Sequence, residues 1–121
     1  MQFREMDERV SYQQQLRESG GPVVLINQFT MPVDQVEQFL NVWANNAEFM
    51  KRQPGCISTQ LYRGTAGSTT FMNVAVWESA GALGQALSSP EFQRRAAAYP
   101  AGVTAAPHVF EKVAVPGICV A

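Results

Sequence analysis

Alternating apolar runs predict four β-strands. Residues 23–29 form a β-branched run between Gly-Pro and Met-Pro, which is typical of a strand buried on both faces. Residues 57–63 and 71–77 flank a loop rich in Gly, Ser and Thr, so they predict a β-hairpin. A last strand is predicted over residues 108–115, because a Pro-Gly pair follows it.

The period of two along each strand predicts which side chains share a face. In the first strand, one face holds Val23, Leu25, Asn27 and Phe29, and the other holds Val24, Ile26 and Gln28. In the hairpin, Ile57, Thr59 and Leu61 alternate with Ser58, Gln60 and Tyr62, while Phe71, Asn73, Ala75 and Trp77 alternate with Met72, Val74 and Val76. Both faces of the predicted sheet therefore carry apolar residues that need a cover.

Apolar residues at helical spacing predict a long helix between the first strand and the hairpin. Pro32 opens it, Asp34 and Glu37 stand at the spacing of a capping box, and a Pro-Gly pair follows its end. Its apolar stripe consists of Val36, Phe39, Leu40, Trp43, Ala47 and Met50. Two shorter helices are predicted after the hairpin, one capped by Ser79 and one that begins at Pro90.

The predicted order is strand, helix, strand, strand, helices, strand. This βαββαβ order is that of a ferredoxin-like α+β fold with an antiparallel sheet. We divide the chain into an N-terminal polar arm (residues 1–21), one α+β domain (residues 22–115) and a C-terminal tail (residues 116–121). The arm predicts either a marginal helix or a mobile tail, since a helix of that length is stable only when it is packed.

The distribution of charge favours an oligomer. The arm holds seven of the nineteen charged side chains, so the rest of the chain is poor in charge. A small domain of this kind is expected to hide part of its surface against another chain. The helices cover one face of the predicted sheet, and the other apolar face needs a second subunit. A twofold homodimer is the simplest prediction, and the arm is a candidate to wrap the partner.

Length and composition exclude several function classes. The 121 residues fit one domain, and a net charge of −1 gives no electrostatic footprint for nucleic acid or an anionic membrane. No apolar run reaches the roughly eighteen residues that span a bilayer. The charged N-terminal sequence resembles no secretory signal, so a cytoplasmic location is expected. Cys56 and Cys119 form neither a disulfide framework nor a metal motif, and each is expected to be a small buried hydrophobe.

No strong catalytic motif is present, so single polar residues on apolar strands become the candidates. An amide such as Asn27 in a buried strand needs a hydrogen-bond partner or loses about 1–3 kcal/mol on desolvation. That partner is either the backbone or a ligand, and the same alternatives apply to Asn73 and to the indole N–H of Trp77.

Other polar side chains are weaker candidates for contact with a ligand. Tyr62 and Tyr99 can donate a phenol hydrogen, and Arg63 can supply a cation to an anionic group. His108 is the one histidine, and it begins the last predicted strand, where a polar surface residue is the common case.

Two segments of the chain are similar to a known family. The first runs from NQFTMP through the long helix to QPGCISTQLYR, and the second is FMNVAVWESAGALGQALSSPEF. Together they resemble the antibiotic biosynthesis monooxygenase superfamily, whose members are dimeric α+β barrels, over about residues 22–115. The resemblance implies a ligand cavity between the sheet and its helices and dimerisation through the opposite sheet face.

Two chemistries occur on this scaffold. In the cofactor-free members, a phenolic substrate loses a proton, reduces O₂ directly and becomes a quinone. In the haem-degrading members, a strand Asn, a strand-end Trp and a helix His carry the reaction. Asn27 and Trp77 match the first two positions, but Ala96 stands at the third and has no donor atom for iron.

The resemblance therefore implies a cofactor-independent monooxygenase that oxidises a small aromatic phenol or quinol with O₂. Asn27 and Trp77 are the expected catalytic residues, and the expected substrate-binding residues are Tyr62, Arg63, Asn73, Tyr99 and His108. A non-catalytic dimeric ligand-binding protein of the same fold is the alternative, and a haem-degrading monooxygenase is a weaker one. An open pocket around Asn27 favours the enzyme, whereas a dry, filled interior favours the binding protein.

Overall fold

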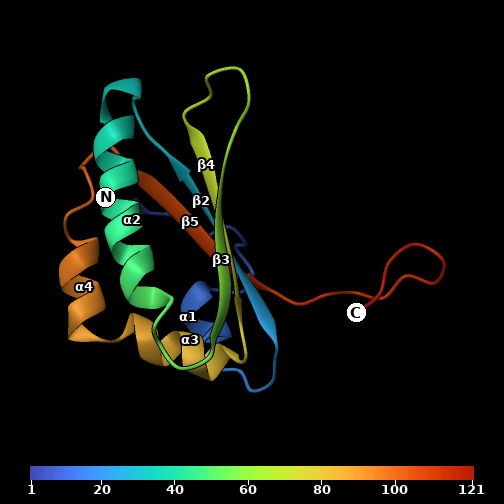
Figure 1. Ribbon diagram of the computed structural model, residues 1–121. Helices are drawn as coiled ribbons and strands as arrows, with labels where there is room; N and C mark the ends of the chain where they lie inside the picture. The colour runs from blue at the N-terminus through green and yellow to red at the C-terminus, as the bar shows by residue number, and fades with distance from the viewer.

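The computed structural model describes residues 1–121 and contains the predicted order of elements (Figure 1). The strands are β1 (Gln2–Phe3), β2 (Val23–Thr30), β3 (Cys56–Arg63), β4 (Thr70–Trp77) and β5 (Thr104–Phe110). The helices are α1 (Tyr12–Gln15), α2 (Val36–Met50), α3 (Ala80–Leu87) and α4 (Pro90–Ala96), and a 3₁₀ turn, η1 (Val33–Gln35), leads into α2. From β2 to β5 this is the βαββαβ order that the sequence predicts.

The five strands form one sheet in the order β1-β5-β2-β4-β3. All neighbouring pairs are antiparallel except β1 and β5. The α+β, ferredoxin-like prediction is thereby confirmed. In the central register, Asn27 lies opposite Asn73 on one side and opposite Pro107 on the other. The helices cover one face of the sheet (Figure 1). The opposite face is open over β2 and β4, whereas Ala106 and His108 of β5 on that face are buried.

The predicted alternation along β2 and β4 is confirmed, and it builds the core under the helices. Phe39 of α2 is fully buried, with its ring centroid 4.9 Å from that of Phe29 and 5.0 Å from that of Phe71. A second cluster joins Leu25 and Trp77 to α3. Burial of these large side chains is the main term that holds the helices on the sheet.

Two predicted strands differ from the observed ones. The register of β3 shifts between Cys56 and Ser58, so Ile57, which the alternation places on the same face as Thr59 and Leu61, is 56% exposed. A bulge of this kind adds one residue to a strand and resets the alternation. The last strand spans 104–110 rather than 108–115, because its Ala-rich start pairs with β2 despite a low strand propensity.

Two further predictions at single residues are wrong. No capping box forms at Asp34, which lies within η1, and neither η1 nor α2 has a side-chain cap. Cys119 is exposed rather than buried, and Cys56 is half-buried. By contrast, Ser79 caps α3 as predicted, because its Oγ accepts a hydrogen bond of 3.0 Å from the Ala82 N–H.

The arm is neither a long helix nor a free tail. It contains β1, which pairs with the edge strand β5, and the four-residue helix α1. Tyr12 of α1 is 7% exposed and belongs to the core cluster that contains Trp77. The arm therefore packs against its own domain.

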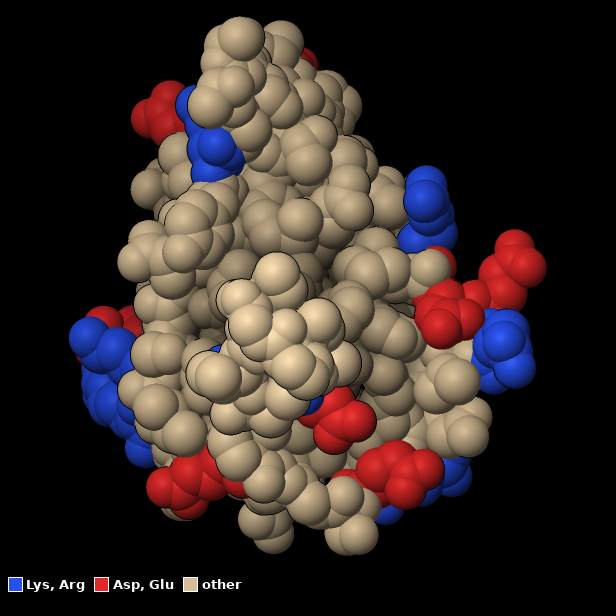
Figure 2. Space-filling model, turned by 90° about the vertical axis from the view of Figure 1, so that its right-hand side faces the viewer, with Lys and Arg blue, Asp and Glu red and all other residues tan.

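The open sheet face carries few charged groups. Its central side chains are half-buried and mostly apolar: Val24, Ile26, Met72, Val74 and Val76. Figure 2 turns this side of the molecule to the viewer, and most acidic and basic residues lie around its margin. In none of the helices does the chain run long and apolar enough to cross a membrane.

Candidate active site

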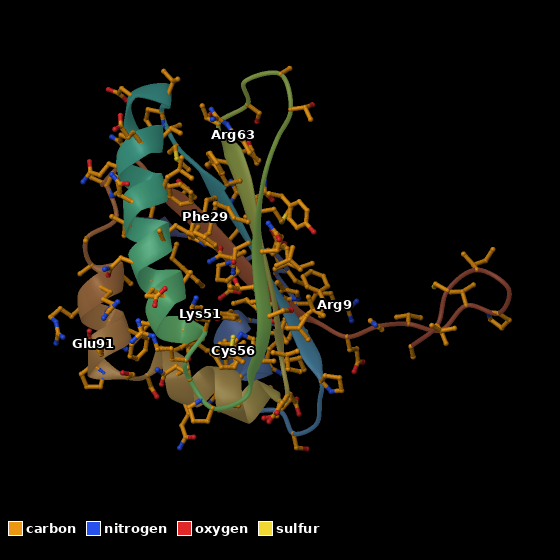
Figure 3. All side chains as sticks on the ribbon, in the orientation of Figure 1. Arg9, Phe29, Lys51, Cys56, Arg63 and Glu91 are labelled. Carbon is orange, nitrogen blue, oxygen red and sulfur yellow. The ribbon has the colours of Figure 1, made fainter.

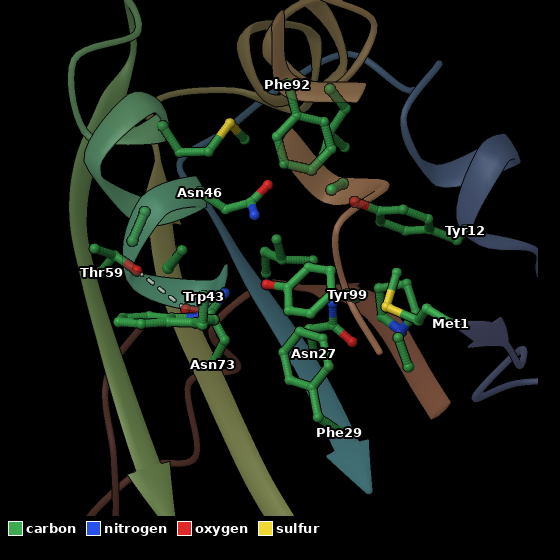
Figure 4. Close-up of a pocket in the computed structure, with 18 of the residues that line it drawn as sticks. Met1, Tyr12, Asn27, Phe29, Trp43, Asn46, Thr59, Asn73, Phe92 and Tyr99 are labelled. Atoms are coloured by element: carbon green, nitrogen blue, oxygen red, sulfur yellow. Dashed lines mark hydrogen bonds between the residues drawn. The ribbon is translucent and has the colours of Figure 1, made fainter. Parts of the chain in front are cut away.

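A cavity of about 210 Å³ lies between the helices and the sheet (Figure 4). Its walls are mainly apolar and aromatic, and none of the lining residues is Asp, Glu, Lys, Arg or His. The polar side chains among them come from four elements: Asn27 of β2, Asn46 of α2, Thr59 of β3 and Asn73 of β4. The site is therefore a neutral aromatic pocket with a small number of converging polar groups.

Asn27 and Trp77 face this cavity because each occupies an inward position on a central strand. Asn27 Oδ1 is buried without a hydrogen-bond partner, and so is Nε1 of Trp77, whose side chain is 1% exposed. A buried polar atom without a partner destabilises the fold by about 1–3 kcal/mol. The two atoms supply one acceptor and one donor that a ligand can satisfy.

Asn73 lies directly across from Asn27, so two amides meet at the centre of the sheet. Thr59 on the neighbouring strand donates a hydrogen bond of 3.1 Å from its Oγ1 to Asn73 Oδ1. This bond fixes the rotation of the Asn73 amide. The hydrogen bond uses only the oxygen of the Asn73 amide, so its NH₂ group can donate to another partner.

Asn46 is a third amide of the site that our sequence interpretation missed. Its side chain is 4% exposed and extends from α2 toward the centre of the cavity (Figure 4). Nδ2 donates to the Val42 carbonyl at 2.8 Å, which leaves the buried Oδ1 without a partner. The available signal was its spacing, because Phe39, Trp43, Asn46 and Met50 recur at three- and four-residue steps along one helix face.

Two phenols complete the polar lining. Tyr99 follows α4 and stacks on Phe29, with ring centroids 5.8 Å apart. Tyr12 enters from the arm, and sequence analysis did not single it out as a ligand-facing residue. Burial raises the pKa of both hydroxyls well above the ordinary value for tyrosine, so both remain neutral hydrogen-bond donors at physiological pH.

Three of the candidate residues lie outside the cavity. Tyr62 is 57% exposed on β3 and belongs to the open-face side of the predicted alternation. Arg63 lies at the hairpin end of the sheet, where its guanidinium covers the Phe71 ring at 5.1 Å (Figure 3). His108 is opposite Ile26 on the open face and lies 3.0 Å from Gln15, measured between their Nε2 atoms. The cavity thus brings together Asn27, Asn73, Trp77 and Tyr99.

The lining does not suit a haem held by histidine. Ala96, at the position that the haem-degrading members give to histidine, lines the cavity with a methyl group. His108 is on the other face of the sheet. The described residues also contain no group of three or more His, Cys, Asp or Glu placed to hold a metal ion.

Comparison with known proteins identifies relatives of this fold. The family model for antibiotic biosynthesis monooxygenase matches residues 22–98. A deoxynogalonate monooxygenase from Streptomyces nogalater is 36% identical over 76 residues, which span 63% of this chain and 64% of that protein. The structure of SnoaB, a cofactor-independent oxygenase from Streptomyces nogalater, has a TM-score of 0.71 and 30% identity, over 78% of this chain and 96% of that one.

A structure from Shewanella loihica PV-4 has a TM-score of 0.65 and 32% identity, over 81% of this chain and 99% of that one. These matches include the strands that carry the amides and the indole of the cavity, because the family model spans β2, β3 and β4. The chain belongs to the antibiotic biosynthesis monooxygenase family.

Proposed function

We propose that the chain is a cofactor-independent monooxygenase that oxidises a small aromatic phenol or quinol with O₂. The observation that carries this proposal is the set of three buried, unpartnered atoms in a neutral cavity: Asn27 Oδ1, Asn46 Oδ1 and Trp77 Nε1. The family membership and the relative described as a cofactor-independent oxygenase support it.

The hydrogen-bonding roles of these three atoms indicate which groups a ligand needs. Asn27 and Asn46 each offer an acceptor, which favours a ligand with two hydroxyl donors. The indole N–H of Trp77 requires an acceptor, such as a carbonyl or a phenolate oxygen. The flat rings of Phe29, Trp43 and Tyr99 suit an aromatic skeleton between them.

No basic side chain lines the cavity, so the substrate has to lose its proton without a strong base. This favours a substrate whose own hydroxyl is acidic. Asn27 Oδ1 accepts the hydrogen bond of the substrate hydroxyl and orients it, and the Trp77 N–H stabilises the negative charge that develops on oxygen when the proton leaves. With no basic side chain to accept it, the proton passes to water at the partly exposed outer wall formed by Met1 and Phe3. Because the lining is mainly apolar, these fixed dipoles act more strongly than they do in bulk water.

The anion then reduces O₂, and the two recombine to a hydroperoxide at a ring carbon. Loss of water from the hydroperoxide leaves a carbonyl. One oxygen atom enters the quinone and the other leaves as water with the two hydrogens lost by the substrate. The electrons come from the substrate, so no external reductant is consumed.

Oxygen uptake tests the proposal. The metal-free protein is mixed with 1,5-dihydroxynaphthalene, a two-ring phenol, or with a hydroquinone, and uptake is corrected for spontaneous oxidation. We expect uptake by the native protein and a loss of about 100-fold or more in the Asn27→Ala/Trp77→Ala variant, because it removes both the acceptor that orients the substrate hydroxyl and the donor that stabilises the anion. The matched control is Asn41→Ala, an exposed amide on α2. Unchanged uptake in the double variant contradicts the assignment, and ligand binding without uptake identifies a non-catalytic binding protein.

We also infer that the chain acts as a homodimer through its open sheet face. The outward side chains of β2 and β4 at the middle of that face are aliphatic. Figure 2 shows most charged residues around its margin. Half-buried aliphatic side chains on an uncovered sheet are typical of a surface that a second subunit covers. The pairing of Ile26 with Val74 places two of these side chains at the middle of the face.

A further inference from the structure

We propose that the arm, residues 1–21, forms one wall of the ligand cavity and determines the size and polarity of the ligand that fits. The family model begins at residue 22, so this wall is additional to the matched domain. Met1, Phe3 and Tyr12 of the arm all line the cavity. The inference rests on the proposed function only in placing the ligand there, and it is tested by binding rather than turnover.

Backbone hydrogen bonds attach the start of the arm to the edge of the sheet. The Gln2 N–H donates to the Val103 carbonyl at 2.7 Å, and the Arg4 N–H donates to the Ala105 carbonyl at 2.8 Å. Phe3 pairs with Ala105, which faces the helices, so its ring is on the cavity side of the sheet. Strand pairing therefore aims Phe3 at the ligand.

Gln15 attaches the other end of this wall. Its Nε2 donates to the Val109 carbonyl at 2.9 Å, and its Oε1 accepts from the Val109 N–H at 2.9 Å. One planar amide thus takes the place of a neighbouring strand at an edge that β1 does not reach. The bonds join residues 94 positions apart in the sequence, so they hold α1 against β5.

This attachment holds Tyr12 at the cavity. Its backbone N–H donates to Glu5 Oε1 at 2.9 Å, and its ring centroid lies 6.3 Å from that of Phe3. Figure 4 shows its hydroxyl directed into the cavity from the side opposite Thr59. Because the hydroxyl stays neutral, it offers a hydrogen to a ligand acceptor.

The volume of the cavity makes the position of the wall decisive. About 210 Å³ exceeds the roughly 150 Å³ of an apolar cavity that takes up benzene, but it is less than the ~300 Å³ at which pockets for larger ligands begin. Met1 and Phe3 are 47% and 54% exposed, so the outer part of the wall is thin. We therefore expect a two-ring ligand to fit inside it and a three-ring ligand to press against Phe3.

Tryptophan fluorescence provides the first test, because Trp43 and Trp77 are the two tryptophans of the chain and both line the cavity. The probes are 1-tetralone and tetralin, which share a two-ring skeleton and differ in one carbonyl acceptor. We expect Tyr12→Phe to weaken 1-tetralone about fivefold, the effect of one neutral hydrogen bond, and to leave tetralin unchanged. Equal effects on the two probes, or none, would overturn the role of the hydroxyl.

The second test loosens or trims the wall in the full chain. We expect Phe3→Ala and Gln15→Ala to improve the binding of xanthone, a three-ring ketone, relative to 1-tetralone by about fivefold or more. The matched control is Gln14→Ala, which removes an exposed amide from the same helix. We further expect 1-tetralone to slow amide hydrogen exchange in residues 2–16.

Unchanged ligand preference in both variants, together with unchanged exchange in the arm, would overturn the wall. A thermal unfolding curve for each variant separates a local effect on the arm from loss of the fold. Because no oxygen is consumed in these measurements, a protein that binds the probes without oxidising anything still tests the wall. Conversely, if the protein takes up oxygen but its ligand binding does not depend on the arm, the proposed function stands and this inference fails.

Discussion

Asn46 joins stability and binding in a single side chain. Its Oδ1 is buried without a partner, whereas its Nδ2 is bonded to the Val42 carbonyl. At a helix position with apolar neighbours, leucine is favoured over asparagine, because it is similar in size and has a higher helix propensity. An amide at this position therefore makes sense as a contact for a ligand.

We expect Asn46→Leu to raise the free energy of unfolding by about 1 kcal/mol, because it removes an unpaired buried acceptor. The same change should weaken 1-naphthol about fivefold and leave naphthalene unaffected, since only the naphthol donates a hydrogen bond. Urea denaturation and tryptophan quenching measure the two effects. Asn41→Leu on the exposed side of α2 is the control, and a destabilised Asn46→Leu variant would contradict this account.

The two cysteines provide an internal comparison. Burial raises the pKa of the Cys56 thiol, whereas Cys119 is exposed in the tail. A raised pKa leaves less thiolate at a given pH, and the thiolate is the species that reacts. We expect iodoacetamide at pH 8 to modify Cys119 at least about tenfold faster than Cys56, and a cavity ligand to slow Cys56 alone. Peptide mass spectrometry separates the two sites, and equal rates would contradict the burial of Cys56.

Strand alternation found part of the candidate site but did not assign its role. It marks Asn27, Asn73 and Trp77 as polar groups on apolar strands, with either the backbone or a ligand as partner. The family resemblance is what makes Asn27 and Trp77 catalytic candidates.

Asn46 was missed because the apolar stripe was traced through Trp43, Ala47 and Met50, and the Asn45-Asn46 pair beside it is typical of the polar side of a helix. Whether a polar residue faces a cavity depends on the helix rotation, which packing against the sheet decides.

At the level of elements, the start of α3 is a local structure that the sequence encodes fully. Ser79 Oγ accepts the Ala82 N–H at 3.0 Å, whereas Ser89 at the start of α4 makes no such bond. We expect Ser79→Ala to lower the free energy of unfolding by about 1 kcal/mol and Ser89→Ala to change it by less than about half of that. Urea denaturation measures both, and equal losses would contradict the cap.

Elements that depend on distant partners were predicted less well. The segment 104–107 reads as a loop of small residues, yet it is a strand because β2 offers a complete antiparallel register beside it. The bulge at Ile57 likewise depends on the alignment of Cys56 with Trp77 across the hairpin. Local propensity describes a residue and its neighbours, whereas these features follow from the pairing of whole strands.

At the scale of the whole molecule, the order of elements predicted the sheet topology but not the path of the arm. A βαββαβ order leaves only a few arrangements with short, right-handed connections. No such rule predicts that the side-chain amide of Gln15 binds the backbone of Val109, 94 residues away in the sequence. Contacts of this kind follow only from the assembled surface, so the sequence of the arm does not distinguish a helix from a tail.

The open sheet face predicts the oligomeric state of the protein. We expect the native protein to sediment as a dimer and Ile26→Lys to sediment as a monomer, because a charge at the centre of an apolar interface is left without a partner. Gln38→Lys, which adds the same charge to an exposed position of α2, is the control and should remain dimeric. A native protein that sediments as a monomer would contradict the inferred dimer.

The same variant separates assembly from ligand binding. The inward residues of β2 and β4, which line the cavity, lie on the face opposite Ile26. Monomeric Ile26→Lys should therefore still bind 1-tetralone, with a dissociation constant within about threefold of the native value. If binding is lost while the fold is retained, the partner contributes to the site, and the cavity has to be understood as a property of two chains.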